Sequence, residues 1–197
     1  MHLKFAVVML FLTTSVSLFS QVAPAATQGG RPLVVGVGVS GFDTEMFAKW
    51  MEGTTVWADW NFDRAPGFLH GFSVEAEVRD LDHGQPNGQR LRQGTAGGGP
   101  LYTWRHFRNF QPYGKFLVDF AAMDHIKDPR LPSWYQGDIW TSYAFGGGAE
   151  YRAYRSVWIR TDYEYQFWRV KFFNPTSFLN PQGFTVGVAY NFSRTGY

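Results

Sequence analysis

The clearest periodic segment of the chain reads Val157-Trp-Ile-Arg-Thr-Asp-Tyr-Glu-Tyr-Gln-Phe-Trp168. Its odd-numbered residues are apolar, aromatic or Thr, whereas the even-numbered residues from Arg160 to Gln166 are charged or polar. Because successive side chains of a β-strand point to opposite faces, the segment predicts a strand with one aromatic face and one charged face. It is also about twice as long as a usual strand of five or six residues.

This pattern has two interpretations. In a sheet of a water-soluble protein, the charged face would meet solvent and the aromatic face would pack on a core. In a transmembrane barrel, the charged face lines a closed interior and the aromatic face meets lipid. Other parts of the sequence have to distinguish the two.

The same alternation recurs along most of the chain. Together with residues 157–168 it predicts eight strands, the other seven over residues 32–41, 54–62, 71–80, 95–105, 111–122, 139–152 and 183–192. Longer loops are expected over residues 42–53, 82–94, 123–138 and 169–182. We find no helical periodicity of useful length.

Residues 1–26 have the organisation of a secretory signal peptide. Lys4 precedes an apolar run over residues 5–19, and Ala23-Pro-Ala25 supplies small residues for cleavage. We expect one domain after cleavage, a barrel over residues 32–192 followed by a short extension over residues 193–197. The chain has no cysteine, so an exported form is stabilised without disulfides. With 18 Lys and Arg against 16 Asp and Glu, the near-neutral charge argues against a nucleic-acid partner.

Three further features favour the membrane barrel. The expected loops alternate between long and short, as in outer-membrane barrels. The polar faces are rich in glycine, which suits a narrow interior. Aromatic residues make up 19% of the chain and gather near the predicted strand ends, as two membrane interfaces would select. One group is Trp60, Phe62, Phe72, Tyr102, Trp104, Tyr151, Tyr190 and Phe192, and the other is Phe120, Tyr143, Phe145, Tyr165, Phe167 and Phe184. We therefore predict an all-β fold, an eight-stranded antiparallel transmembrane up-and-down β-barrel.

The closing segment makes the resemblance specific. Residues 185–192 contain Gly187, Tyr190 and Phe192 at the spacing of the C-terminal sorting signal of bacterial outer-membrane proteins. The whole mature chain resembles the outer membrane β-barrel domain family, the OmpA-like and OmpX-like small barrels. The resemblance implies a bacterial outer-membrane location and insertion by the barrel-assembly machinery. It also implies a monomer in contact with outer-membrane lipid and lipopolysaccharide.

Charged residues on the inward faces are the main candidate site. The expected interior ionic network is Asp59, Glu75, Glu77, Arg79, Lys115, Asp119, Glu150, Arg152, Arg160, Asp162 and Glu164. An eight-stranded barrel is just wide enough for side chains to fill it, so mutually neutralising charges would plug the interior. The alternative is a narrow pore that prefers cations, since acidic residues are in excess. The tight turn over residues 153–156 further predicts that Glu150 lies opposite Arg160.

An enzyme is the third possibility, because some small outer-membrane barrels hydrolyse lipid A acyl chains. That chemistry would need a nucleophilic Ser close to a His base. Here His70 and Ser73 are three residues apart, and His83, His106 and His125 have no lipid-facing Ser nearby in the sequence. We therefore expect a structural or surface-interaction protein rather than an enzyme, with no catalytic residues, cofactor or metal.

Overall fold

The structure is a computed structural model that describes residues 33–46, 48–62, 70–84, 90–107, 109–124, 137–170 and 177–192. The expected signal peptide and the extension after residue 192 lie outside these residues. The strands are β1 (Leu33–Met46), β2 (Ala48–Asn61), β3 (Phe72–Gly84), β4 (Arg90–Thr103), β5 (Phe110–Asp124), β6 (Gly137–Tyr154), β7 (Val157–Val170), β8 (Ser177–Leu179) and β9 (Gln182–Asn191). Among the described residues, no helix is long and apolar enough to cross a membrane.

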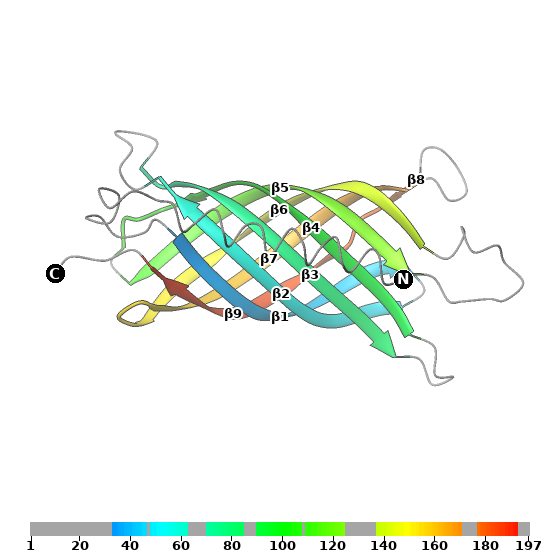
Figure 1. Cartoon of the computed structure of the whole chain (residues 1–197), viewed down its shortest axis with the longest axis horizontal. Coiled ribbons are helices and arrows are strands. Elements are labelled where there is room, and N and C mark those ends of the chain that lie inside the picture. Colours follow the sequence, from blue (N-terminus) through cyan, green and yellow to red (C-terminus); the bar gives the residue numbers. More distant parts are fainter. Residues whose placement is uncertain are drawn as a thin grey trace, which may run out of the picture. The chain divides into compact units, whose positions relative to one another are not determined.

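The strands close into a ring. Each of β1 to β5 pairs antiparallel with the next strand. β6 then pairs with β7, β7 with β9, and β9 with β1. Figure 1 shows these long strands inclined around the barrel. The predicted eight-stranded antiparallel barrel is confirmed. We call the end where β1 begins and β9 finishes the terminal end, on the left in Figure 1, and the opposite end the distal end.

The strands reach further toward the distal end than the sequence predicts. The long loop expected over residues 42–53 is wrong, because β1 continues to Met46 and β2 begins at Ala48. The pairing shifts register between Asp43 and Met46, where Glu45 has a positive φ of 54°. The inward residues here include the fully buried Phe42, whereas Asp43 and Glu45 lie on the outward side, so the usual alternation of polar inward and apolar outward residues is lost. The contrast between long and short loops was therefore overestimated at this hairpin.

The other distal loops are also shorter than expected. β3 continues to Gly84 and β4 already begins at Arg90, while β5 reaches Asp124 and β6 starts at Gly137. Part of the loop predicted over residues 169–182 is strand as well, since β7 reaches Val170 and β8 lies inside the interval.

The last wall strand is interrupted at Pro181. β7 pairs with β8 and with β9 in one continuous register, in which Trp168 lies opposite Leu179 and Tyr165 opposite Gln182. The backbone N–H of Gln166 still donates to the carbonyl of Pro181 at 2.8 Å. The N–H and the carbonyl of a residue in an antiparallel strand point to the same neighbour, and proline has no N–H, so the ladder to β7 lacks one donor at Pro181. On the other side, the β1–β9 ladder ends at the pair of Asp43 and Gln182, and the next backbone N–H facing β1, that of Asn180, donates to Glu45 Oε2 at 3.0 Å.

The outward face is apolar along every long strand. Its exposed residues include Val37 and Val39 on β1, Val78 on β3, Phe120 on β5 and Val186 on β9. The aromatic residues of the two predicted groups contact other rings, both along one strand and across neighbouring strands. Tyr102 packs edge-on against Phe72 and Trp104, and Tyr190 against Phe192, near the terminal end. Phe145 contacts Phe116 and Phe167 further toward the distal end.

Candidate functional site

The inward faces bring charged side chains from five strands into the barrel interior. Period-2 geometry dictates this placement, since an inward residue is followed by an outward one along each strand. Nine of the eleven residues in the expected network are almost completely buried: Asp59, Glu75, Glu77, Arg79, Lys115, Asp119, Arg160, Asp162 and Glu164.

Lys115 of β5 lies at the centre of this group. Its Nζ is 2.6 Å from Glu77, 3.0 Å from Asp162, 3.0 Å from Glu164 and 3.1 Å from Glu75. These carboxylates come from β3 and β7, neither of which neighbours β5 in the ring. The ammonium therefore joins strands across the interior rather than along the wall.

Arg79 of β3 holds the distal side of the network. Its guanidinium contacts Glu77 at 2.5 Å and Glu164 at 2.8 Å, and its Nε donates to Thr55 Oγ1 at 3.1 Å. The ring of Phe42 lies against the same guanidinium, with 4.1 Å from Cζ to the ring centroid. Cation–π contacts of this kind are stronger when both groups are shielded from water.

Arg160 of β7 holds the terminal side. Its guanidinium contacts Glu75 at 2.5 Å and Asp59 at 3.2 Å, and its Nε donates to the hydroxyl of Tyr113 at 2.7 Å. Glu150 lies directly opposite on β6, as predicted, at the longer distance of 3.9 Å. Arg160 is therefore paired chiefly with carboxylates of β2 and β3, two strands that do not adjoin β7.

The remaining two members of the expected set lie further from the centre. The Glu150 side chain is 14% exposed, near the terminal end of β6. Arg152 lies two residues further along β6. Its Nε donates to the carbonyl of Arg155, in the turn that follows the strand, at 2.7 Å. The structure thus places Arg152 apart from the central group, because two residues along a strand move a side chain toward the rim.

The central group carries more negative than positive groups. Its three cations, Arg79, Lys115 and Arg160, are surrounded by six carboxylates: Asp59, Glu75, Glu77, Asp119, Asp162 and Glu164. Buried carboxylates without a partner would be expensive, and neutral donors share the task of satisfying them. The Tyr113 hydroxyl donates to Asp162 at 2.7 Å, and Gln166 Nε2 donates to Glu164 at 2.6 Å.

Sequence reasoning missed the apolar clusters that lie beyond the charges. Along β7, the inward residues run from Trp158 near the terminal end, through Arg160 and Glu164, to Trp168 toward the distal end. The terminal cluster is Val34, Trp57, Trp158 and Ala189. Two distal clusters are Phe42, Met51, Leu81 and Leu91, and Ala121, Met123 and Trp168 with Trp140 and Leu179 packed against them. The unusual feature that signals them is a large apolar residue at an inward position.

The structure also describes Ser73, which was considered for catalysis, and the three closing-strand residues of the sorting signal. Ser73 faces the interior, and its hydroxyl donates to Asn61 Oδ1 at 2.7 Å. Within the described ranges, no group of three or more His, Cys, Asp or Glu side chains is arranged to hold a metal ion. The closing-strand residues Tyr190 and Phe192 lie outward with their rings 4.7 Å apart, while Gly187 faces inward over Trp57.

Residues 11–192 match the family described as the outer membrane protein beta-barrel domain. The chain belongs to this family. The match covers the complete ring of strands together with part of the expected signal peptide. Membership places the protein in the bacterial outer membrane, with its apolar outward face toward lipid. No curated protein sequence matches the chain.

Solved structures of this barrel type have the same fold. Neisserial surface protein A is 11% identical, with a TM-score of 0.60 over 84% of this chain and 100% of that chain. The attachment invasion locus protein Ail of Yersinia pestis is 16% identical, with a TM-score of 0.53 over 81% of this chain and 96% of that chain. OprG of Pseudomonas aeruginosa is 12% identical, with a TM-score of 0.53 over 84% and 97%. At these low sequence identities, the comparison with solved structures shows a shared fold and nothing more.

Proposed function

We propose that this protein is a closed outer-membrane barrel with a structural or surface-interaction role. The observation that carries the proposal is the layered interior. An ionic layer around Lys115 lies between an apolar cluster near Trp158 and others near Phe42 and Trp168. A hydrated ion would have to pass all of these layers.

Electrostatics supports the closed state. Lys115 has four carboxylate contacts, and its side chain is only 1% exposed. Removing one partner from such a buried group leaves an uncompensated charge, at a cost of roughly 3–5 kcal/mol. Opening a path along the barrel would separate several of these contacts at once. The interior therefore favours one tightly connected arrangement.

The exposed side chains at the distal end support a surface-interaction role. Beyond the charged interior, the long strands present exposed side chains such as Trp50, Glu45 and Glu52. Arg92 and Asp80 form an exposed bidentate pair with distances of 2.6 and 2.7 Å. A rigid barrel that displays mixed charged and aromatic groups suits contact with polar surface molecules. Ail, which shares the fold, was solved in complex with the heparin analogue sucrose octasulfate.

A narrow cation-preferring pore is the second candidate. Its support is the excess of carboxylates, six against three cations in the central group. Rings of acidic side chains select cations in channels. To open such a path, all three apolar clusters would have to move together.

Conductance measurements in planar bilayers test whether the protein is a closed barrel or a cation-preferring pore. Mature protein is refolded, its folded state is checked by heat-modifiable gel mobility, and it is added to a bilayer with a salt gradient. We expect no current steps above those of protein-free detergent. Regular current steps whose reversal potential shows cation selectivity would contradict a closed barrel and support the pore. Steps without ion selectivity would contradict both candidates.

A further inference from the structure

The outward face contains an open groove of about 530 Å³ over the middle of the β3–β7 wall. Its floor is formed by Gly114 of β5 and Gly147 of β6, which are cross-strand partners. On both sides of this pair the same row continues with aromatic residues. Tyr102 is the partner of Gly114, and Tyr163 is the partner of Gly147. Two missing side chains thus leave a gap in a row that is otherwise aromatic.

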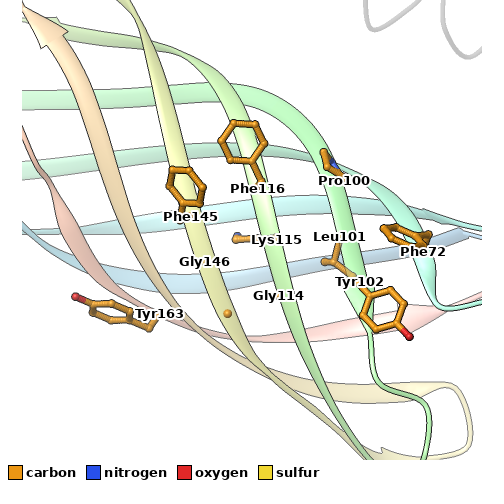
Figure 2. A pocket seen from close by; sticks show the side chains of 11 residues that line it. Phe72, Pro100, Leu101, Tyr102, Gly114, Lys115, Phe116, Phe145, Gly146 and Tyr163 are labelled. Atoms are coloured by element: carbon orange, nitrogen blue, oxygen red, sulfur yellow. The ribbon is translucent and has the colours of Figure 1, made fainter. Parts of the chain in front are cut away.

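Aromatic rings form the walls of the groove. Phe116 and Phe145 lie side by side, with their ring centroids 4.8 Å apart. Phe72 and Tyr102 form a second pair at 4.9 Å, and Figure 2 shows this pair separated from the first along the groove. Tyr163 stands on a third side in the same view. The walls are therefore aromatic, and they leave the two glycines uncovered.

The groove offers no free charge to an occupant. Lys115 is its one charged lining residue, and its ammonium is held inside the barrel by carboxylates. The other lining residues are apolar, aromatic or glycine. A polar occupant would lose hydration without gaining partners, whereas a hydrocarbon would lose nothing.

Packing does not require glycine at position 114. A Cβ atom added there would meet only the carbonyl oxygen of Gly146, at the ordinary contact distance of 3.9 Å. Among the described glycines, Gly71 is the one with a positive φ, so the backbone at Gly114 is open to other residues as well. The empty space at Gly114 is thus a property of the outer surface and not a by-product of strand geometry.

From these observations we propose that the groove binds one acyl chain of a membrane phospholipid. The outward face of this family meets lipid, so hydrocarbon is the medium around the groove. At the terminal end the groove opens beside Tyr102 and the exposed Trp104, aromatic residues of the kind that lie at the headgroup level. A headgroup at this rim lets its chain run inward between the two ring pairs. The inference rests on the family assignment and is independent of whether the interior is closed.

Photo-crosslinking tests the proposal. The refolded mature chain is inserted into phosphatidylethanolamine–phosphatidylglycerol vesicles that contain a trace of phosphatidylcholine with a diazirine in its acyl chain. After irradiation, labelled positions are mapped by mass spectrometry. We expect the outward groove residues Gly114, Phe116, Phe145 and Gly147 to be labelled several-fold more than Val186 and Val188, which lie on the outward face outside the groove.

Two variants sharpen the result. Gly114→Leu fills the floor and should reduce labelling of the groove to the level of Val186. Ala122→Leu changes an exposed outward residue of the same strand outside the groove and should leave groove labelling unchanged. Both variants are checked for folding by heat-modifiable mobility.

Three outcomes would overturn the proposal. Uniform labelling of the outward face would show that the groove has no preference for a chain. Equal labelling of wild type and Gly114→Leu would place the bound chain elsewhere. Protection of the groove that increases with protein density, together with cross-linked dimers, would assign it to a second copy of the chain. Bilayer conductance does not enter any of these results, so failure here is separate from failure of the closed-barrel proposal.

Discussion

Glu150 and Arg160 face each other across the β6–β7 hairpin, yet the shortest ion pair of Arg160 is with Glu75 on β3. The register places Glu150 opposite Arg160, but the two charged groups are 3.9 Å apart, against 2.5 Å for Glu75. The guanidinium therefore spans the interior. Strands that never pair are joined by a buried contact.

This geometry predicts unequal energetic coupling. In double-mutant cycles with Gln, the Glu75–Arg160 pair should have a coupling free energy of roughly 1.5–3 kcal/mol, since charged hydrogen bonds contribute about that much. The Glu150–Arg160 pair should couple by less than about 1 kcal/mol, because it is longer and partly exposed. Urea titration of vesicle-inserted protein measures both. A larger coupling for Glu150 would show that the hairpin pair dominates.

Among the interior cations, Lys115 should be the one whose substitution lowers the stability of the protein most. Lys115→Met keeps the length of the side chain but leaves four carboxylates without their shared partner. We expect a loss of roughly 3–5 kcal/mol in the free energy of unfolding. The control is Arg92→Met, which removes an exposed ion pair and should cost about 0–1 kcal/mol. Similar losses for the two variants would argue against a buried network.

The lipid-facing surface makes a separate prediction. Val118→Arg and Val186→Arg place a charge on exposed mid-strand positions, and each should lower stability in a bilayer by about 2–4 kcal/mol. Asn109→Arg, in the exposed turn between β4 and β5, should have almost no effect. Urea titrations in vesicles compare the three. If all three variants behave alike, the outward face does not contact hydrocarbon.

The orientation in the membrane is predicted from the even number of strands, which leaves both ends of the chain on the periplasmic side. The chain has no cysteine, so single replacements report cleanly. Glu52→Cys near the distal end should react with a membrane-impermeant maleimide in intact cells. Arg155→Cys in the β6–β7 turn should react only after the outer membrane is permeabilised. The reverse pattern of labelling would invert the topology.

The sequence predicted the wall of the barrel better than its interior. Alternation placed Lys115, Asp162 and Glu164 correctly on the inward side, since period 2 follows from strand geometry alone. It failed at Phe42, where an apolar residue faces inward while Asp43 and Glu45 lie on the outward side, so polarity indicates the wrong face. The partners of Arg160 were also beyond reach, because contacts across the interior depend on how the ring closes and not on the order of strands.

Pro181 has a further consequence for dynamics. It removes one donor from the ladder to β7, next to the place where the β1–β9 ladder ends at Asp43 and Gln182, and toward the distal end β8 has a ladder with β7 alone among the described residues. A segment held on one side opens more readily than a segment held on both. Amide hydrogens of residues 177–179 should therefore exchange with deuterium well before those of residues 184–190. The missing N–H and the end of the β1 ladder fall at the same place, so together they would divide a single wall strand into two units of different local stability.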